Sequence, residues 1–454
     1  MKTTMTNLNQ IRASLLSRIK PSEAEKARLA SLAKSIISRV NSIAEQESIS
    51  ASAQLVGSSA RGTWISGEHD LDIFIMFQPD VERKELEEKG LYIARKVAEV
   101  SEGFEERYAE HPYIHAVFDG FEVDLVPAFN VASAADIKSA VDRTPFHNIY
   151  VSSMIKGLED EVLLLKQFMK GIGVYGSELK THGFSGYLVE LLLINYGSFV
   201  KVLEAACDWK SGVIIDIEKH GCMSHSDPMV VVDTTDPARN VAAALSLDNM
   251  CNFIDKACQF LENPDETYFT GKAPEPLGDN EFKKILTARG TSLIAIEFAA
   301  PDVVEDVLFP QLHKLEESVR EMFERYDFRV YNSGIWADKK AIALFELETA
   351  SLPQVKRHTG PHVWAKEHAS AFKSKYKDSN TFSNVFIENG KYMVEIPRKY
   401  TGARKLVESG ILNCALGKHV ALSIKKEFQV LEDSELLDIT DEEFRKFLRR
   451  FFEK

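Results

Sequence analysis

Cysteine is scarce in this sequence, and no Cys-x-x-Cys pair occurs. The five cysteines, an odd number, are Cys207, Cys222, Cys251, Cys258 and Cys414. This scarcity excludes a small protein built on disulfides and leaves no thiolate zinc site. We therefore expect free thiols, buried in the fold, and a reducing compartment, the cytoplasm.

Long apolar runs are also missing. Residues 1–20 contain no apolar stretch of signal-peptide length. The most apolar helical segment, residues 188–200, is interrupted by Glu190, Asn195 and Gly197, so it is too short and too polar to cross a bilayer. The chain has no internal repeat and no low-complexity tract. We expect no membrane partner.

Positive charge is in deficit over the chain as a whole. The 55 Lys and Arg residues face 68 Asp and Glu, which gives a formal net charge of −13. Taken alone, this value argues against a nucleic-acid binder, because phosphate contacts need a positive surface. The charge is uneven, however, since residues 351–430 carry 14 Lys and Arg against 6 Asp and Glu. An acidic body with one basic patch near the C-terminus is therefore expected.

Enough apolar sequence is present for several full-sized cores. The 454 residues are 44% hydrophobic and 27% charged, as in folded multidomain proteins. Periodicity predicts a mixed α+β, multidomain fold: a small α/β domain at 1–150, a helical domain at 151–270 and an α/β region at 271–454. The run GKAPEPLGDN, residues 271–280, marks the last boundary.

Local signals predict individual elements. Ser22 followed by Glu25 fits a capping box, so a helix to about Ile43 is expected. The same domain is predicted to contain strands at 54–56 and 71–77, a helix capped by Asp80 that runs to about Val100, and a hairpin of 114–118 and 121–129 turning at Asp119 and Gly120.

Helices dominate the predicted second domain. Ser185 is expected to cap one apolar helix that extends to Cys207, and residues 237–262 form another. In the third region we predict strands at 292–298, 329–331, 341–347 and 393–396, and helices at 310–326, 365–376 and 441–452.

The densest group of chemically useful residues is GSSARGTWISGEHDLDIF, residues 57–74. Gly57 and Ser58 follow a short strand, so free backbone N–H groups and the Ser58 hydroxyl are placed to bind an anion. Asp70 and Asp72 lie two apart in a strand, so their carboxylates project from one face. Two such carboxylates can converge on a hard cation such as Mg²⁺.

A second strand, FEVDLVPAF at 121–129, adds further acids. Alternation puts Glu122 and Asp124 on one face and does not choose between them. Asp124 lies deeper in the apolar run, where a carboxylate needs a metal or a hydrogen-bond partner. Three carboxylates on neighbouring strands can hold two Mg²⁺ ions for nucleotidyl transfer. The alternative is that Asp70 and Asp72 only begin a strand beside a polar loop.

These patterns resemble a known superfamily. Gly-Ser, then Asp-x-Asp, then an Asp on a later strand is the signature of the polymerase-β-like nucleotidyltransferases. The segments ERYAEHPYIHA, SAVDRTPFH, GIGVYG, GFSGYLVELLLINYGSF and RNVAAALSLDN, in this order, resemble the archaeal, class I CCA-adding tRNA nucleotidyltransferases over about 57–250. VEDVLFPQL at 304–312 extends the likeness, and beyond about 320 it rests on domain order.

The resemblance implies a role for each matched residue. Three acids would bind metal and act in catalysis, the last of them beside the tRNA 3′-hydroxyl: Asp70, Asp72 and Asp124. Gly57 and Ser58 would hold the triphosphate of the nucleotide, with Arg61 nearby. Thr144 and His147 would contact its sugar and phosphate, and Lys166 and Tyr175 its phosphates. Arg239 would contact the edge of its base. The planar donor fork of an arginine suits base acceptors. Some family members have Glu-x-Asp where this chain has Asp-x-Asp.

Each of these residues has a structural alternative. Lys166 on an amphipathic helix would, seen alone, be a solvated lysine. Tyr175 would be a packing aromatic and His147 a satisfied core histidine. Arg239 follows Asp236 closely enough to form an ion pair at the start of a helix.

The resemblance implies a fold of a polymerase-β-like head, a helical central domain and an α/β C-terminal RNA-binding region. It implies an enzyme that adds CMP, CMP and then AMP from CTP and ATP to the 3′ end of tRNA, without a template and with release of pyrophosphate. Two Mg²⁺ ions would serve as cofactors, and the enzyme would bind the acceptor arm and 3′ end of tRNA. The sequence does not decide whether the protein forms a homodimer.

The basic stretch 351–430 agrees with an RNA partner. It interleaves lysines such as Lys373 and Lys375 with Trp364, Phe372 and Tyr376, and cations beside aromatic rings suit an RNA backbone. The alternative is a solvated face. Two other functions stay open: a poly(A)-polymerase-like transferase, which CTP use would distinguish, and a non-catalytic tRNA-binding protein, which an intact set of three acids disfavours.

Overall fold

The structure, a computed structural model, describes residues 2–108, 110–221, 226–271 and 274–453. The chain divides into two compact units, Met1–Lys272 and Ala273–Lys454. No single helix of the described residues is both long and apolar enough to cross a membrane, although two helices that meet at 93°, Gly186–Tyr196 and Phe199–Ala206, pass that test when taken together.

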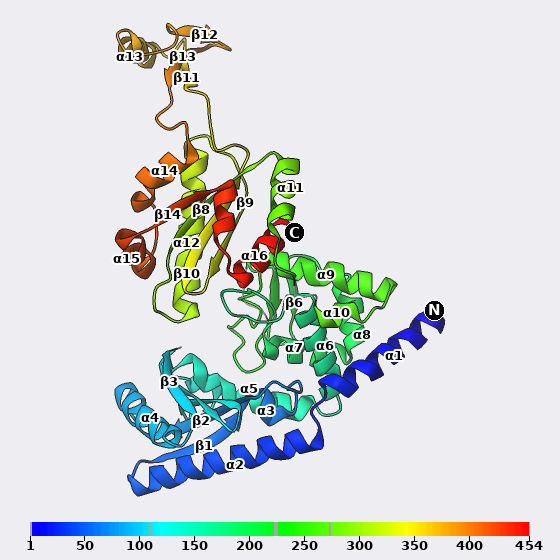
Figure 1. The fold of residues 1–454 in the computed structure, drawn as a ribbon. Helices are drawn as coiled ribbons and strands as arrows, with labels where there is room; N and C mark the ends of the chain where they lie inside the picture. The colour runs from blue at the N-terminus through cyan, green and yellow to red at the C-terminus, as the bar shows by residue number, and fades with distance from the viewer. Residues whose placement is uncertain (1, 109, 222–225, 272–273, 454) are drawn as a thin grey trace. The chain divides into compact units, whose positions relative to one another are not determined.

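A five-stranded mixed sheet forms the first part of the first unit (Figure 1). Its strands, in spatial order, are β1 (Ala51–Val56), β2 (Asp70–Phe77), β5 (Phe121–Phe129), β4 (Pro112–Phe118) and β3 (Gly103–Tyr108). Only β2 and β5 run parallel, with Asp72 opposite Asp124. The predicted hairpin is confirmed, and its turn residues Asp119 and Gly120 both have positive φ, as a tight hairpin turn requires.

Two helices, α2 (Glu23–Gln46) and α4 (Arg83–Ala98), bury their apolar side chains in one core with the sheet. The capping box of Ser22 and Glu25 is confirmed. The prediction that Asp80 caps α4 is wrong, because the helix begins after Glu82 without a side-chain cap. The N–H of Val81 donates to the C=O of Gln78, so Asp80 lies in a turn that precedes the helix.

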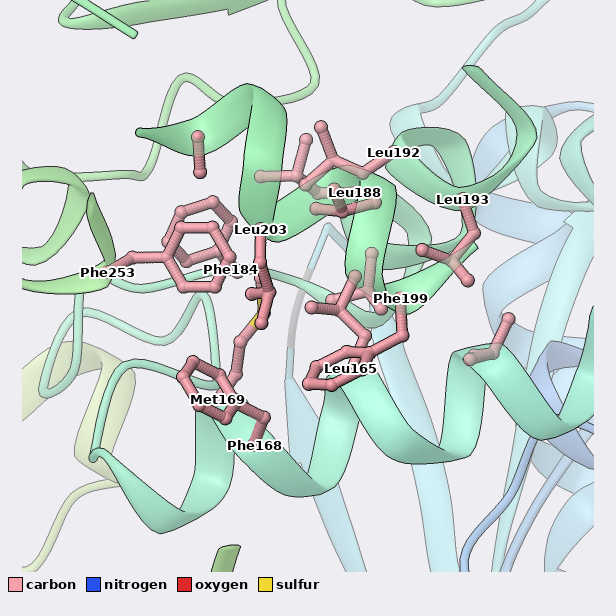
Figure 2. Close-up of a cluster of buried hydrophobic side chains, with 14 of the residues drawn as sticks. Leu165, Phe168, Met169, Phe184, Leu188, Leu192, Leu193, Phe199, Leu203 and Phe253 are labelled. Atoms are coloured by element: carbon pink, nitrogen blue, oxygen red, sulfur yellow. The ribbon is translucent and has the colours of Figure 1, made fainter. Parts of the chain in front are cut away.

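Helices build the rest of the first unit. They are α1 (Lys2–Ile19), α3 (Gly57–Arg61), α5 (Thr144–Met154), α6 (Glu159–Gly171), α7 (Gly186–Tyr196), α8 (Phe199–Ala206), α9 (Leu247–Glu262) and α10 (Thr267–Thr270), with short 3₁₀ turns at Ala134–Asp136 and Ala140–Arg143 and a strand pair β6 (Val213–Ile215) and β7 (Met229–Val231). Their shared core gathers large apolar side chains such as Phe168, Phe199 and Phe253 (Figure 2).

Three predictions for this helical part are wrong. The single apolar helix breaks into α7 and α8 at Gly197, which has φ of 86°, and Ser198 caps the second helix; Ser185 does cap the first. The helix predicted at 237–262 begins only at Leu247, because the preceding residues turn back to pair with β7.

The third correction concerns the thiols. Cys207 and Cys258 form a disulfide, where we expected free cysteines. They lie 51 residues apart in the sequence, and the packing of α8 against α9 brings their Cα atoms to 5.6 Å, a normal disulfide separation. Cys251 and Cys414 are free, and Cys222 lies outside the described residues.

The second unit contains a four-stranded antiparallel sheet in the order β14 (Gln429–Glu432), β8 (Ser292–Ala299), β10 (Lys340–Leu347) and β9 (Val330–Ala337). Separate apolar clusters cover its two faces. The helices are α11 (Asp279–Arg289), α12 (Glu305–Arg325), α14 (Ala403–Gly410), α15 (Lys418–Lys426) and α16 (Glu442–Phe452), with 3₁₀ turns at Ile411–Asn413 and Asp433–Asp438. The start predicted for α12, Pro310, lies inside the helix.

A smaller sheet carries much of the basic stretch. Its strands are β11 (Val355–His362), β13 (Lys391–Pro397) and β12 (Phe386–Glu388), and α13 (Lys366–Tyr376) packs beside it. Trp364 is 71% exposed, and the His362 ring stacks on it at 4.4 Å between centroids. The small sheet therefore offers aromatic surface next to lysines.

Candidate active site

Three acids predicted from the sequence lie on one face of the sheet, where β2 and β5 run side by side. Asp72 lies opposite Asp124 and Asp70 opposite Glu122 in the parallel register, so all four side chains share one face. The burial pattern separates the two candidates on β5: Glu122 is exposed and Asp124 is half-buried. Asp124 also has the hydrogen-bond partner that its position requires, since its Oδ1 lies 2.7 Å from Nδ1 of His115 on β4.

The carboxylates perturb one another. Desolvation raises the pKa of Asp72 to about 6, and repulsion from Asp124 and Asp70 adds to the effect while Arg61 opposes it. The pKa of Asp70 is raised by desolvation first and then by Glu122 and other nearby acids. Ionising these carboxyl groups therefore costs free energy unless a cation lies near them.

These residues fit a divalent cation in their chemistry. Carboxylate oxygens are the ligands that Mg²⁺ prefers, and a cation would stabilise the charged carboxylates against the desolvation and the repulsion that raise the two pKa values. Among the described residues, no three His, Cys, Asp or Glu side chains are already gathered closely enough to hold a metal ion.

Gly57 brings the anion-binding turn against the acids. It begins α3 with φ of +77°, and a Cβ at this position would lie 2.0 Å from Oδ2 of Asp72. Only glycine allows both the backbone conformation and this close approach. The Ser58 hydroxyl has no hydrogen-bond partner within the described part of the chain. The structure thus places the Gly-Ser turn and Asp72 side by side.

Arg61, the last residue of α3, belongs to a buried group of charges that the sequence did not reveal as a unit. Arg61 forms an ion pair with the fully buried Glu190 at 2.9 Å and donates to Asn148 at 3.0 Å. Thr63 donates its hydroxyl to Glu190 at 2.6 Å. The guanidinium of Arg61 is therefore committed to protein partners, while its charge still acts on Asp72.

Lys166 and Tyr175 lie together in this region. Lys166 is 2% exposed and donates to the C=O of Thr63 at 2.8 Å, so the alternative of a solvated lysine is excluded. Burial lowers the pKa of Lys166 and raises the pKa of Tyr175. Both side chains border Gly186, where a Cβ would lie 3.1 Å from the Tyr175 hydroxyl and 3.8 Å from the Lys166 amine.

His147 and Arg239 meet at a second buried acid, Asp233. Its Oδ2 lies 2.9 Å from Nε2 of His147 and accepts from Nη1 of Arg239 at 2.8 Å. The alternative of an Arg239–Asp236 pair is excluded, because Arg239 pairs with Asp233 and Asp236 pairs with Arg143. Thr144 begins α5, one turn before His147, and is half-buried.

Sequence reasoning missed three partners of these residues: His115, Glu190 and Asp233. Glu190 had a signal, since it is the only acid in the apolar segment 186–196, and a buried charge must be paired. Asp233 ends the apolar run MVVVD, the same pattern that drew attention to Asp124. His115 alternates with apolar residues in PYIHAVF and faces Asp124 only once β4 and β5 pair.

Three family profiles match successive parts of the chain. They are described as a nucleotidyltransferase domain over residues 37–147, a tRNA nucleotidyltransferase second domain over 160–270 and a CCA-adding enzyme C-terminal domain over 289–433. The first two contain every candidate site residue.

Full-length relatives are similar throughout. The CCA-adding enzyme of Methanosarcina mazei is 50% identical over 453 residues, which cover 99% of this chain and 100% of that protein. The CCA-adding enzyme of Methanosarcina acetivorans is 49% identical over 443 residues, 97% of this chain and 98% of that protein. That of Methanothermobacter thermautotrophicus is 39% identical over 448 residues, 97% of each.

Proposed function

Because the chain belongs to the archaeal CCA-adding enzymes, the class I tRNA nucleotidyltransferases, we propose that it adds CMP, CMP and then AMP to the 3′ end of tRNA without a template and releases pyrophosphate. The observation that supports this reaction most directly is the approach of Asp72, opposite Asp124, to the Gly57 backbone. We place the reaction in the cytoplasm. Sedimentation of the purified protein would show whether it is a monomer or a homodimer.

The reaction is tested with tRNA ending at the discriminator base, at C or at CC, each incubated with one nucleoside triphosphate. We expect CTP to be used on the first two and ATP only on the third. Repeated addition of AMP to every substrate, with no use of CTP, would instead indicate a poly(A)-polymerase-like transferase. Binding of tRNA without any incorporation would indicate a non-catalytic protein.

The nucleotidyltransferase superfamily is typically metal-dependent, and we propose that Asp70, Asp72 and Asp124 hold two Mg²⁺ ions. When bound, the ions would neutralise the triphosphate and make the tRNA 3′-hydroxyl more acidic. His115 fixes one oxygen of Asp124, which leaves the other oxygen free to accept the proton of that hydroxyl.

The remaining candidates are proposed to hold the nucleotide. The backbone at Gly57 and the hydroxyl of Ser58 would donate to the triphosphate. Lys166 and Tyr175 would contact its phosphates, with the charge of Arg61 behind them, and a nearby phosphate would restore the lowered pKa of Lys166. Thr144 and His147 would contact the sugar, and Arg239 the base edge.

Without Mg²⁺, the contribution of Asp72 to the stability of the protein, measured as the difference from Asp72→Asn, is expected to fall as the pH rises from about 4 to above about 6. The pKa of Asp72 is raised from 3.8 to about 6 in the folded protein, so the folded state binds more protons than the unfolded state in this window. Mg²⁺ should then raise the Tm more at about pH 8 than at about pH 5. Differential scanning calorimetry measures both effects.

Asp72→Asn is expected to remove most of the Mg²⁺ effect on the Tm, and Asp80→Asn, an exposed acid outside the site, to leave it unchanged. A Tm increase by Mg²⁺ that is the same in Asp72→Asn as in the wild type would exclude Asp72 as a metal ligand.

For tRNA binding, the structure distinguishes the ion-paired arginines of the basic stretch from two of its lysines, Lys373 and Lys375. Arg357, Arg398 and Arg404 form ion pairs with acids of the same unit. Lys373 and Lys375 are exposed on α13, each with its amine 5.1 Å from the centre of a tyrosine ring, and have no ion pair within the described residues. We propose that these lysines contact the tRNA backbone.

Reversing both charges, Lys373→Glu with Lys375→Glu, should weaken tRNA binding and reduce the slope of log Kd against log salt by about two, one for each phosphate contact. Filter binding at several salt concentrations measures the slope. The matched control is Lys283→Glu with Lys284→Glu, two exposed lysines of α11, for which the slope should stay near the wild-type value. Equal slopes in all three proteins would place the tRNA contacts elsewhere.

A further inference from the structure

One buried carboxylate joins two of the residues proposed to hold the nucleotide. Asp233 is fully buried, and its Oδ2 is shared by His147 at 2.9 Å and Arg239 at 2.8 Å. We propose that Asp233 is a positioning residue that sets the enzyme's base selectivity by fixing Arg239 and His147 relative to each other. This inference rests on the proposed function.

Asp233 is anchored independently of the two residues that it positions. Its Oδ1 accepts from the N–H and from the hydroxyl of Thr235, both at 2.9 Å. The Tyr187 hydroxyl approaches the same oxygen at 3.4 Å, and the Tyr187 ring stacks on His147 with 4.1 Å between centroids. The carboxylate therefore has a fixed orientation before any nucleotide binds.

The charge of Asp233 fixes the hydrogen on His147. Burial alone would raise the pKa of Asp233, but hydrogen bonds from His147, Thr235 and Arg239 hold it well below its ordinary value. An ionised carboxylate can only accept, so Nε2 of His147 carries a hydrogen. When the ring is neutral, Nδ1 is an acceptor, which suits a ribose hydroxyl.

The same contacts leave Arg239 with donors to spare. Only its Nη1 donates to Asp233, and neither Nε nor Nη2 donates a hydrogen bond within the described residues. The backbone is also held, because the N–H of Asp233 donates to the C=O of Arg239 at 3.1 Å and the N–H of Arg239 to the C=O of Asp236 at 2.9 Å. The Nε and Nη2 donors of Arg239 are therefore available to a ligand, on a loop that backbone hydrogen bonds hold in place.

A guanidinium with a fixed orientation can distinguish cytosine and adenine from uracil and guanine. Cytosine and adenine carry an acceptor nitrogen on their pairing edge, whereas uracil and guanine carry an N–H there. A guanidinium that cannot turn away would pair with the first two and face a donor on the others. A mobile guanidinium would lose this discrimination, and so Asp233 is the residue on which it depends.

The test is Asp233→Asn, which keeps the shape and removes the charge. We expect the KM for CTP to rise and the preference for CTP over UTP, as a ratio of kcat/KM, to fall by about tenfold each. The kcat for CTP should change less than about threefold. Thr235→Val is the matched control: it removes one hydrogen bond from the same carboxylate but keeps its charge, so its selectivity should stay at the wild-type value.

A double mutant separates positioning from general stability. In an Arg239→Ala background, Asp233→Asn should lower the selectivity no further, because the residue through which it acts is gone. Wild-type selectivity in Asp233→Asn, an equal loss in Thr235→Val, or additive losses with Arg239→Ala would each overturn the proposal. If Asp233→Asn does not fold, the single variants His147→Ala and Arg239→Ala and their double variant test the proposal instead. Because one carboxylate holds both residues, the losses of selectivity in the two single variants should not add in the double variant.

Failure of the proposed function would be distinguishable. If the wild-type protein incorporated no CMP at all, titration calorimetry with Mg²⁺ would still measure the affinities of the wild type and of Asp233→Asn for CTP and for UTP. About tenfold less preference for CTP in Asp233→Asn than in the wild type would support the positioning role, and an unchanged preference would overturn it.

Discussion

Asp124→Ala is expected to lower CMP incorporation into tRNA lacking CCA by about a thousandfold or more, with the fold retained. Asp124 lies opposite Asp72 on neighbouring strands, and we propose that it binds metal and accepts the proton of the attacking hydroxyl. Losing both roles removes transition-state stabilisation, so kcat and kcat/KM should fall together. Single-turnover incorporation of labelled CMP measures the loss, and the Tm verifies folding.

The control is Glu122→Ala, two residues earlier on the same face of β5. Glu122 is exposed and pairs across the sheet with Asp70, so its removal should change the rate by less than about threefold, through the milder repulsion on Asp70. Incorporation by Asp124→Ala at the wild-type rate would remove this acid from the catalytic set. A large loss in Glu122→Ala alone would show that the wrong carboxylate had been chosen.

Gly57→Ala should lower kcat/KM for CTP by about a hundredfold or more, although it adds a single methyl group. The new Cβ would lie 2.0 Å from Oδ2 of Asp72, so the carboxylate or the anion-binding turn must move. Either shift separates groups that we propose act on the same triphosphate. Steady-state kinetics with CTP measures the effect.

Gly62→Ala supplies the matched control for backbone strain. Gly62 ends the same short helix with φ of +71°, and a Cβ there meets nothing within 4 Å. The alanine therefore carries a similar conformational cost, about 1 kcal/mol, without contact to Asp72. We expect a small decrease in Tm and near-normal kinetics. Equal kinetic losses in the two variants would attribute the Gly57 effect to strain rather than to displacement of Asp72.

Much of the first sheet could be predicted because its signals are local. The run LDIFIMF, the alternation of FEVDLVPAF and the Asp119–Gly120 turn each lie within one element. The apolar pattern continues on both sides of Gly197 and so hides the break, although Gly197 followed by Ser198 is itself a local signal for the end of one helix and the start of the next. The Cys207–Cys258 bond, by contrast, follows only from the contact of α8 with α9.

The candidate site divides in the same way. The residues recognised from the sequence lie in short motifs, whereas their supporting partners come from distant segments. Glu190 lies 129 residues from Arg61, and Asp233 lies 86 residues from His147. Neither carboxylate shows its partner in the sequence, and tertiary folding alone brings them together.

The parallel pairing of β2 with β5 also constrains the order in which the protein can fold. A parallel pair cannot close through a tight turn, so α4, β3 and β4 all separate Asp72 from Asp124 along the chain. A shift in register by one residue would turn Asp124 to the other face. Such non-local pairing is slow. A refolding or newly synthesised chain thus acquires its acids as a set, when β5 docks in register, and the Mg²⁺ binding that we propose for these acids would report the completion of that step.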